Sequence, residues 1–476
     1  MAQSTARPVG GQFNSVRDQF QQHEGLPFLR LLSRDLIEAA CRSCQHFWRE
    51  RIYTPSITLA IFLSQILSDD QSCDDAVDRF QKYRFDRGLP PVATSTGSYC
   101  DARQRLPEPL VWELVRLVGR AIQQQAHPTW LFHGRAVKIA DGSTVLMPDT
   151  PKNQAAYPQA KTQSPGVGFP IARILVVFSL AVGTVLEAAV GPYKGKETSE
   201  LALLRQIINA FQPGDIFLAD RFFCSYWVIA ALRSRGVDVV VRLHQRRRGD
   251  FRRGRRLGRE DRLITWKKPE QRPAWMSRTE YEAMPAELTV RLLRVRVQDK
   301  TKRVRKLELV TTLEDAREYP KKEVGGLFRQ RWHAELDLRT LKSQMEMEML
   351  RTKNPEMVGK ELAVHLLAYN LIRGIMAEAA RAAEVKPRQL SFTGAQHTIR
   401  AFEAVHLHDP ARIAADLPRL LELIGAKRVG DRPDRYEPRA VKRRPKPHPL
   451  LKMPRKAARR LIERGRIPYD KKEYKT

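Results

Sequence analysis

The chain has 476 residues, 42% of them hydrophobic, which is enough for roughly two to four globular domains with sizeable cores. Residues 1–14 are polar and lack the apolar centre of a signal peptide, and the longest apolar stretch, residues 174–189, is interrupted by Gly183, Thr184 and Glu187. We therefore expect neither export nor a membrane span, and the net charge of +31 indicates a polyanionic partner.

The positive charge is concentrated in two segments. Residues 242–306 contain 22 Lys and Arg against 8 Asp and Glu, and residues 427–476 contain 19 against 6, so that 27 of the 31 excess charges lie there. Runs such as Arg246-Arg247-Arg248 lack the interleaved acids of an ordinary solvated face. We interpret this clustering as contact with nucleic acid rather than as a solvated face.

The cysteines form an odd and sparse set for so long a chain: Cys41, Cys44, Cys73, Cys100 and Cys224. Such a set argues against a disulfide framework and indicates a reducing compartment. Cys41 and Cys44, with His46 close by, have the spacing of half a zinc site, but no second pair of ligands at comparable spacing follows. We therefore interpret the cysteines as structural.

Residues 1–130 are predicted to be helical. Apolar residues recur at helical spacing in residues 28–37, 57–67 and 110–118, and prolines at positions 55 and 107 begin two of the helices. A further segment leads from Ser95 into Arg103 and Arg105. Periodicity alone leaves open whether this segment is a small helix that reads DNA or one that only packs against its neighbours.

The pattern changes from helices to strands at residue 136. Three strands are predicted at residues 136–140, 172–181 and 184–190, and the last two are joined by a turn at Val182-Gly183. The elements that follow are a helix at 199–211, a strand at 216–219, a helix at 226–235, a strand at 237–243, alternating β residues at 288–297 and a strand at 307–312. This order predicts a mixed α/β sheet that is covered by helices.

A long helix is predicted after Pro320, running to about residue 350, and helices at residues 357–384 and 418–424 follow it. The tail is rich in Pro, Lys and Arg and is predicted to be largely irregular or extended. We therefore expect an N-terminal helical DNA-binding region (1–130), a core in two parts (131–243 and 307–355) around a basic β insertion (244–306), a C-terminal helical region (356–426) and a basic tail (427–476).

Two aspartates come directly after predicted apolar strands. Asp141 follows Ala140, and Asp220 follows Ala219. A carboxylate in such a place is costly unless it is paired or binds a metal, and the ends of adjacent strands are where α/β folds assemble their sites. Taken singly, each aspartate is better explained as the cap of a loop.

The long helix carries an acid on a partly apolar face. Steps of three and four residues place five side chains on that face: Phe328, Arg331, Glu335, Leu338 and Lys342. Glu335 is therefore expected to face the protein rather than bulk water. A surface ion pair between Arg331 and Glu335 explains the same spacing equally well.

The spacing Phe328-x2-Arg331-x3-Glu335-x6-Lys342 resembles the Y-x2-R-x3-E-x6-K signature of the insertion-sequence transposases of family four. This DDE group has an RNase H-like catalytic core. The resemblance implies an RNase H-like mixed sheet that is interrupted by a mostly β insertion and flanked by N-terminal and C-terminal helical regions.

The resemblance covers roughly residues 135–360 and extends to two further motifs, Asp141-Gly142-Ser143 and Asp220-Arg221-Phe222-Phe223. It departs at Phe328, where the signature has Tyr, and at Phe222, where Gly is frequent. Neither departure removes a carboxylate.

The resemblance implies that Asp141, Asp220 and Glu335 are the catalytic acids and hold two Mg²⁺ ions, for which Mn²⁺ substitutes. Asp141 would bridge both ions, and each of the other two acids would complete one. Carboxylate oxygens are the hard ligands that Mg²⁺ prefers, and two such ions suit phosphodiester chemistry. Arg331 and Lys342 would then bind the phosphates that flank the scissile bond.

The resemblance also implies contacts to DNA from Phe328, Arg221 and Trp266. Trp266 lies between Thr265 and Lys267-Lys268, is expected to be exposed, and would stack on a flipped base. Core packing is the commoner fate of a tryptophan.

Its implied partner is double-stranded DNA, namely the terminal inverted repeats of an insertion sequence and the target. The implied reaction is DNA cleavage followed by strand transfer, in a homodimer, in the bacterial cytoplasm at the nucleoid and away from membranes. The C-terminal helices around residues 357–384 are the candidate dimer contact.

Two other functions are compatible with this sequence. One is an Mg²⁺-dependent DNA nuclease without strand transfer, and the other is an inactive, domesticated DNA-binding protein. The second is disfavoured because a protein that only binds DNA has no need of three carboxylates beside the phosphates, where they repel.

Overall fold

The computed structural model describes residues 32, 34–48, 51–86, 88–195, 197–298, 304–406, 412–430 and 450–466. In these residues a single nine-stranded sheet has the order β3-β2-β1-β4-β5-β9-β8-β7-β6. The strands are β1 (Val137–Leu146), β2 (Ile171–Ser179), β3 (Val185–Pro192), β4 (Ile216–Ala219), β5 (Asp238–Arg242), β6 (Arg255–Gly258), β7 (Asp261–Lys267), β8 (Glu287–Gln298) and β9 (Val304–Thr311).

The sheet is mixed, as predicted. β1, β2 and β3 pair in antiparallel fashion, β4 and β5 run parallel to β1, and β9 returns antiparallel to β5. The tight connection between β2 and β3 depends on Gly183, whose φ of +82° is a conformation that favours glycine. The predicted order of strands and helices from residue 136 to residue 243 is confirmed.

The two faces of the central strands are buried in two different cores, because successive side chains of a strand point to opposite faces. Ile139 contributes to the core that contains α6 (Glu108–Gln124) and α13 (Pro355–Ala382). The next residue, Ala140, contributes to the core that contains α8 (Glu200–Gln206) and α9 (Tyr226–Arg233). Helices therefore cover both faces of this part of the sheet.

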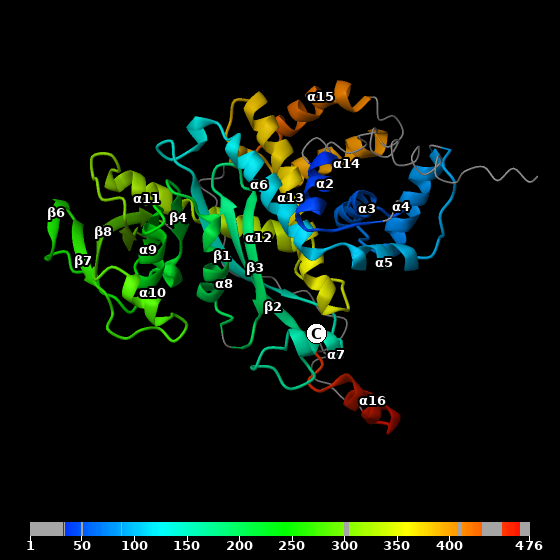
Figure 1. The fold of residues 1–476 in the computed structure, drawn as a ribbon, viewed down its shortest axis with the longest axis horizontal. Helices are drawn as coiled ribbons and strands as arrows, with labels where there is room; N and C mark the ends of the chain where they lie inside the picture. The colour runs from blue at the N-terminus through cyan, green and yellow to red at the C-terminus, as the bar shows by residue number, and fades with distance from the viewer. Residues whose placement is uncertain are drawn as a thin grey trace, which may run out of the picture.

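The N-terminal region is helical where it is described. It contains α2 (Arg34–Ser43), α3 (Pro55–Leu67), α4 (Cys73–Asp86), α5 (Gly97–Arg105) and α6. Figure 1 shows α3, α4 and α5 on the side of the molecule opposite β6 and β7. The first predicted apolar stretch, residues 28–37, lies partly outside the described residues.

The helix α5 packs against its neighbours through Arg103. This side chain is buried, with its guanidinium carbon 4.1 Å from the ring centroid of Phe62, and it donates a hydrogen bond to Gln65. Of the two explanations that periodicity left open for this segment, the structure supports packing for Arg103, whereas Arg105 stays exposed.

The helix α13 is the centre of the helical part of the molecule. Nearly all of its residues are buried, because α3, α6, α14 (Phe392–His406) and α15 (Arg412–Ala426) contact it. The prediction that the C-terminal helices around residues 357–384 form a dimer contact is therefore wrong for α13, which is covered within the protomer.

The basic insertion continues the core sheet rather than forming a separate one. Residues 291–298 of β8 pair with the whole of β9, and β7 and β6 follow outward from β8. Figure 1 shows these strands at one end of the molecule, next to α9 and α10 (Arg278–Ala283). The insertion is thus joined to the central strands through β9 and β5.

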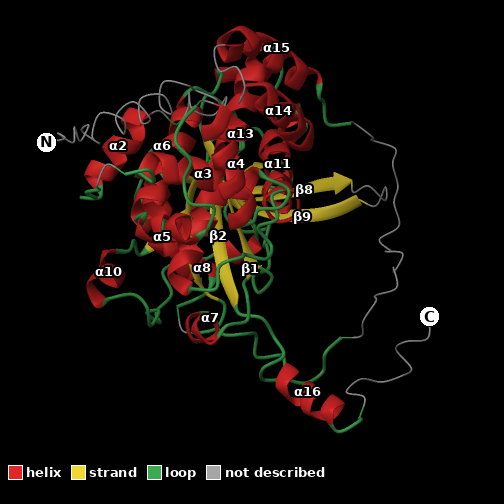
Figure 2. Ribbon diagram, turned by 90° about the vertical axis from the view of Figure 1, so that its right-hand side faces the viewer, coloured by secondary structure: helices red, strands yellow, loops and turns green. Residues whose placement is uncertain are grey.

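The tail contains one described helix, α16 (Arg455–Glu463), where the sequence predicted irregular or extended chain. Residues 431–449 and 467–476 lie outside the described residues. Figure 2 shows α16 standing apart from the body of the molecule. Among the described helices, none has the length and apolarity that a membrane span requires.

Candidate active site

Asp141 and Asp220 lie beside each other because β1 and β4 are parallel neighbours in a fixed register. Ile139 pairs with Leu218, so that two residues further along each chain Asp141 stands level with Asp220. Adjacent strands are about 4.8 Å apart. One detail differs from the prediction: Asp141 is within β1, which continues to Leu146, whereas β4 ends at Ala219.

The two aspartates have different surroundings. Burial raises the pKa of Asp141 to about 6, against the opposing charge of Arg331. One of its oxygens accepts a hydrogen bond from the backbone N–H of Gly142 at 3.0 Å. Asp220 accepts one from the backbone N–H of Phe222 at 2.7 Å and so caps a short 3₁₀ helix (Arg221–Phe223). Backbone contacts thus orient both carboxyl groups.

Arg331 connects the third acid, Glu335, to Asp141. Its guanidinium lies 3.7 Å from the carboxylate of Asp141 and 2.5 Å from that of Glu335, so that one cation joins the two acids. The ion pair between Arg331 and Glu335 that the spacing suggested is therefore present, and it belongs to the site rather than to a remote surface.

The predicted long helix is divided. α11 (Lys321–Arg329) ends before Arg331, α12 (Trp332–Arg339) begins after it, and a π-helical turn (Thr340–Gln344) follows. At the junction, Arg331 and Ala334 donate to carbonyls three residues back, which is the tighter 3₁₀ pattern. The prediction of one continuous helix to residue 350 is therefore wrong, although Arg331 and Glu335 still meet across the junction.

Lys342 lies in the π-helical turn. Its ammonium group is 3.5 Å from Glu348, whose side chain is 62% exposed. An exposed acid at this distance is a weak partner. Lys342 is therefore available for another anion if Glu348 moves away.

Two aromatic side chains predicted to contact DNA are buried instead. Phe328 is 7% exposed and packs in the core that contains α13, because the apolar face of α11 points inward. Trp266 is 8% exposed, packs beside Leu288, and has the guanidinium of Arg247 at 4.1 Å from its ring. Stacking of a base on either ring is not possible in this arrangement.

Other groups near the acids were not identified from the sequence. Phe222, 42% exposed, follows Asp220, and Trp332, 52% exposed, follows Arg331. Glu200, at the start of α8, is close enough to influence the pKa of Asp141. In the sequence Glu200 is one of many acids in the first turn of a helix, where acids are favoured in any case, so no local signal marks it.

The chemistry of this site suits a divalent cation, since the donors are carboxylates and a positive group already lies between two of them. In the described part of the chain, no three His, Cys, Asp or Glu side chains are close enough to hold a metal as they stand. The guanidinium of Arg331 lies between Asp141 and Glu335. Arg331 would have to withdraw before these two acids could share an ion.

The cysteine motif offers no comparable site. Cys41 is buried, and burial raises the pKa of its thiol to about 11, which disfavours the thiolate that zinc requires. The five cysteines are free in the structure.

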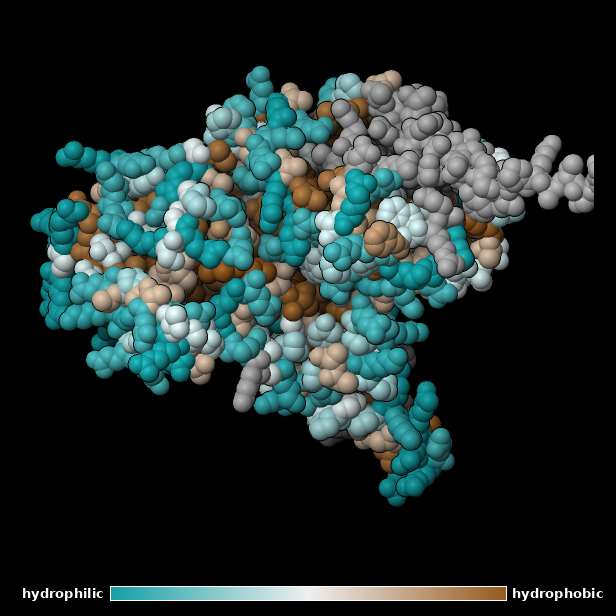
Figure 3. All heavy atoms as spheres, viewed as in Figure 1, coloured by the Kyte–Doolittle hydropathy of each residue, from teal (hydrophilic) through white to brown (hydrophobic). Residues whose placement is uncertain are grey.

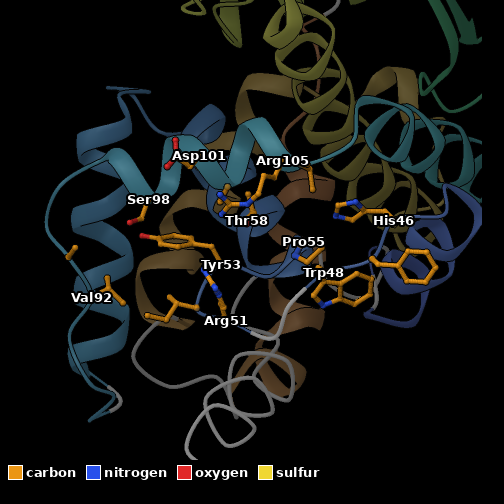
Figure 4. Close-up of a pocket in the computed structure, with 15 residues that line it drawn as sticks. His46, Trp48, Arg51, Tyr53, Pro55, Thr58, Val92, Ser98, Asp101 and Arg105 are labelled. Atoms are coloured by element: carbon orange, nitrogen blue, oxygen red, sulfur yellow. The ribbon is translucent and has the colours of Figure 1, made fainter. Parts of the chain in front are cut away.

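A separate hollow of about 940 Å³ lies in the N-terminal helical region. Figure 4 shows Arg51 and Tyr53, from the segment before α3, together with Ser98 and Arg105 of α5 along its walls. None of the three acids lines it.

Comparisons with known proteins identify the family of this chain. A family model described as "Transposase DDE domain" matches residues 132–371, which include the three acids, Arg331 and Lys342. The transposase InsG for insertion sequence element IS4 of Escherichia coli (strain K12) is 30% identical over 370 residues, which cover 76% of this chain and 79% of that protein. The family has an RNase H-like fold, as predicted. The chain therefore belongs to the DDE transposases of insertion sequence family four, enzymes that cleave DNA and transfer its strands.

Proposed function

We propose that this transposase binds the terminal inverted repeats of its insertion sequence and uses Asp141, Asp220 and Glu335 for Mg²⁺-dependent DNA cleavage and strand transfer. The observation that carries the proposal is the register of β1 and β4, which sets two aspartates side by side, with Glu335 joined to one of them, Asp141, through Arg331. A purely structural ion pair would account for the contact between Arg331 and Glu335, but it would not account for the position of Asp220 beside Asp141.

Asp141, Asp220 and Glu335 would hold two Mg²⁺ ions, with Asp141 shared, and Mn²⁺ would substitute. Bound ions of this kind activate the attacking water or 3′ hydroxyl and stabilise the leaving oxygen. The protein supplies carboxylates that are oriented before the reaction, through the backbone N–H groups of Gly142 and Phe222.

Arg331 and Lys342 would bind the phosphates beside the scissile bond. A guanidinium presents a planar pair of N–H groups that matches two phosphate oxygens, whereas an ammonium acts as a point charge. In the free protein, Arg331 pairs with Glu335 and Lys342 pairs with Glu348. On binding DNA, each cation would therefore replace a carboxylate partner with a phosphate.

The basic insertion would guide the DNA. Its exposed arginines include Arg246 to Arg248, Arg252, Arg253, Arg255 and Arg256. Arg221 points toward this segment, because it donates a hydrogen bond to Gln245 at 3.2 Å. Figure 3 shows hydrophilic side chains over much of the lobe that carries β6 and β7. Phe222 and Trp332 replace Trp266 as the exposed rings on which a base would stack.

Two transposon ends must be joined in one reaction, so we propose a homodimer in the complex with DNA. Its contact surface is not α13. We further propose that the enzyme acts at the bacterial nucleoid.

The test uses purified protein, a duplex that carries the element's end sequence, a target plasmid and Mg²⁺. Asp141→Asn, Asp220→Asn and Glu335→Gln should each abolish cleavage while end binding stays close to wild type, because each change removes a metal ligand without changing size. Full cleavage by any one variant would remove that residue from the triad.

The same assay separates the alternatives. Cleavage of the ends without joining to the plasmid would indicate a nuclease, and binding without cleavage under any divalent metal would indicate a DNA-binding protein that has lost activity.

A further inference from the structure

Glu200 approaches the acids from the face of the sheet opposite Glu335. It is the first residue of α8, which Ser199 caps, and α8 packs on β2 and β3 with Leu203 and Leu204 in the core that contains α9. Glu335 belongs to α12, whose Ala334 and Leu338 lie in the other core. The two helices thus bring a glutamate each to the same stretch of β1 from opposite faces.

The carboxyl group of Glu200 lies against Gly142, the residue after Asp141. A Cβ atom at position 142 would be 2.4 Å from the carboxyl carbon of Glu200 and 2.4 Å from its Oε1. Such distances are shorter than any contact between packed atoms, so only glycine leaves room for Glu200 here. The strand β1 therefore has a gap in its row of side chains, and a carboxylate fills that gap.

The neighbouring strand β4 does not separate the carboxylate of Glu200 from Asp220. β4 ends at Ala219, while β1 continues to Leu146, so Gly142 stands just past the end of β4. The electrostatic effects agree with this placement. After burial, which is the largest cause, the charge of Asp220 raises the pKa of Glu200, and that of Glu200 contributes to raising the pKa of Asp141.

Glu200 has no direct hydrogen-bond or ion-pair partner in the described residues. Its carboxylate makes no hydrogen bond or ion pair there, and Arg173, whose charge favours its ionised form, donates its own hydrogen bond to the carbonyl of Thr198. A half-buried carboxylate beside two others is unfavourable unless a cation offsets the repulsion.

We infer that Glu200 is a fourth carboxylate of the metal site, which contributes an oxygen ligand to a divalent cation held by Asp141 and Asp220, directly or through a bound water. This inference rests on the proposed function. It assigns to Gly142 the role of leaving space for that ligand.

The test is titration of Mn²⁺ into the full-length protein without DNA, followed by calorimetry, for wild type and Glu200→Gln. Loss of a ligand should weaken Mn²⁺ binding about tenfold or more. Gly142→Ala should weaken it similarly, because the added methyl group displaces Glu200 while all the charges remain. Glu197→Gln, in the loop before α8, is the matched control and should bind Mn²⁺ as wild type does.

Melting curves of the same proteins distinguish a ligand from a structural residue. Without metal, Glu200→Gln should melt at the wild-type temperature or above, since a repelling charge is removed, and its rise in Tm with Mn²⁺ should be smaller. Wild-type affinity for Mn²⁺, or weaker affinity together with an early melt of the metal-free protein, would overturn the inference.

Asp141→Asn separates this inference from the proposed function. If Asp141→Asn loses Mn²⁺ binding and Glu200→Gln keeps it, only the inference about Glu200 fails. If Asp141→Asn also binds Mn²⁺ as wild type does, the proposed metal site is wrong and Glu200 has no part in one.

Discussion

At the scale of single residues, the site is organised around Arg331. Its guanidinium neutralises part of the charge of Asp141 and Glu335, which would otherwise repel each other in a half-buried place. In the proposed function, the same group would bind a phosphate once the acids hold a metal ion. Its role would therefore differ between the free enzyme and the proposed complex with DNA.

Arg331→Ala is expected to lower the single-turnover cleavage rate by about 100-fold or more, as loss of a preorganised charge at a reaction centre does. Arg331→Lys should also be impaired, because one ammonium cannot reproduce two parallel contacts. Cleavage rates are to be measured together with a melting curve for each variant. If both variants melt early and their folded fraction cleaves at the wild-type rate, Arg331 is only structural.

His365 provides a second prediction at this scale. It is buried on α13, its Nδ1 has no hydrogen-bond partner, and burial lowers its pKa to about 3. Its ordinary pKa is 6.5, so at pH values between these two the unfolded chain binds one proton more than the folded chain. The free energy of unfolding should therefore fall as the pH falls, by about 2 kcal/mol from pH 6.5 to pH 5 through this residue alone.

The measurement is denaturant unfolding at several pH values. His365→Leu should flatten the dependence on pH by this amount, whereas His397→Leu, at an exposed position of α14, should keep the wild-type dependence. An unchanged dependence on pH in His365→Leu would show that the histidine binds protons equally in the folded and unfolded chain, so that burial does not lower its pKa.

At the scale of elements, the strands were predictable and the helix junction was not. The strand at residues 216–219 is where the sequence placed it, because an apolar run between polar segments has few other structures. The division at Arg331 has no Pro or Gly to mark it, and helical periodicity continues through it. The position of Glu200 depends on where β1 and β4 end, and the burial of Trp266 depends on which segments cover β7. Neither follows from local pattern.

The helix α12 is held in place by a buried ion network around Asp337, two residues after Glu335. Asp337 accepts hydrogen bonds from Arg373 at 2.6 Å, from Arg388 at 2.6 and 2.7 Å, and from the hydroxyl of Tyr369 at 2.9 Å. Arg388 also donates to the carbonyls of Ser179 and Leu180, so the network ties α12 to α13 and to the end of β2.

Asp337→Asn should lower the free energy of unfolding by about 3 to 5 kcal/mol, because it leaves two buried guanidinium groups without their anion. The control is Glu314→Gln, which breaks the more exposed pair with Arg233 and should cost about 0 to 1 kcal/mol. Urea unfolding of both variants measures the difference. Equal losses in the two variants would show that the buried network contributes no more than a surface pair.

At the scale of the whole molecule, we expect the basic tail to be a separate source of affinity for DNA. Residues 427–429 pair with residues 389–391 and belong to the fold. Residues 431–476 contain 17 Lys and Arg against 6 Asp and Glu, and the basic side chains of α16, such as Arg455 and Arg459, are exposed. The tail thus offers charge for phosphates without any evident means of reading bases.

Deleting residues 431–476 should weaken binding to the element's end and to a scrambled duplex alike. It should also reduce the salt dependence of binding. The slope of the logarithm of the DNA-binding constant against the logarithm of the salt concentration should become less steep by about 0.9 for each phosphate that the tail neutralises in the wild-type complex. A variant with Arg455, Lys456, Arg459 and Arg460 all changed to Gln isolates the contribution of α16. An unchanged salt slope after the deletion would show that the tail does not touch DNA.

If the acids bind a metal and Arg331 binds a phosphate, as proposed, the bridge that Arg331 forms between Asp141 and Glu335 would link two binding equilibria. A phosphate would compete with these acids for the guanidinium, so DNA that draws Arg331 away would free the acids, and a metal that occupies the acids would free Arg331. Linkage requires the two effects to be equal: the factor by which DNA raises metal affinity is the factor by which metal raises DNA affinity. Mn²⁺ titrations with and without the end duplex would measure this cooperativity, and Arg331→Ala should abolish it.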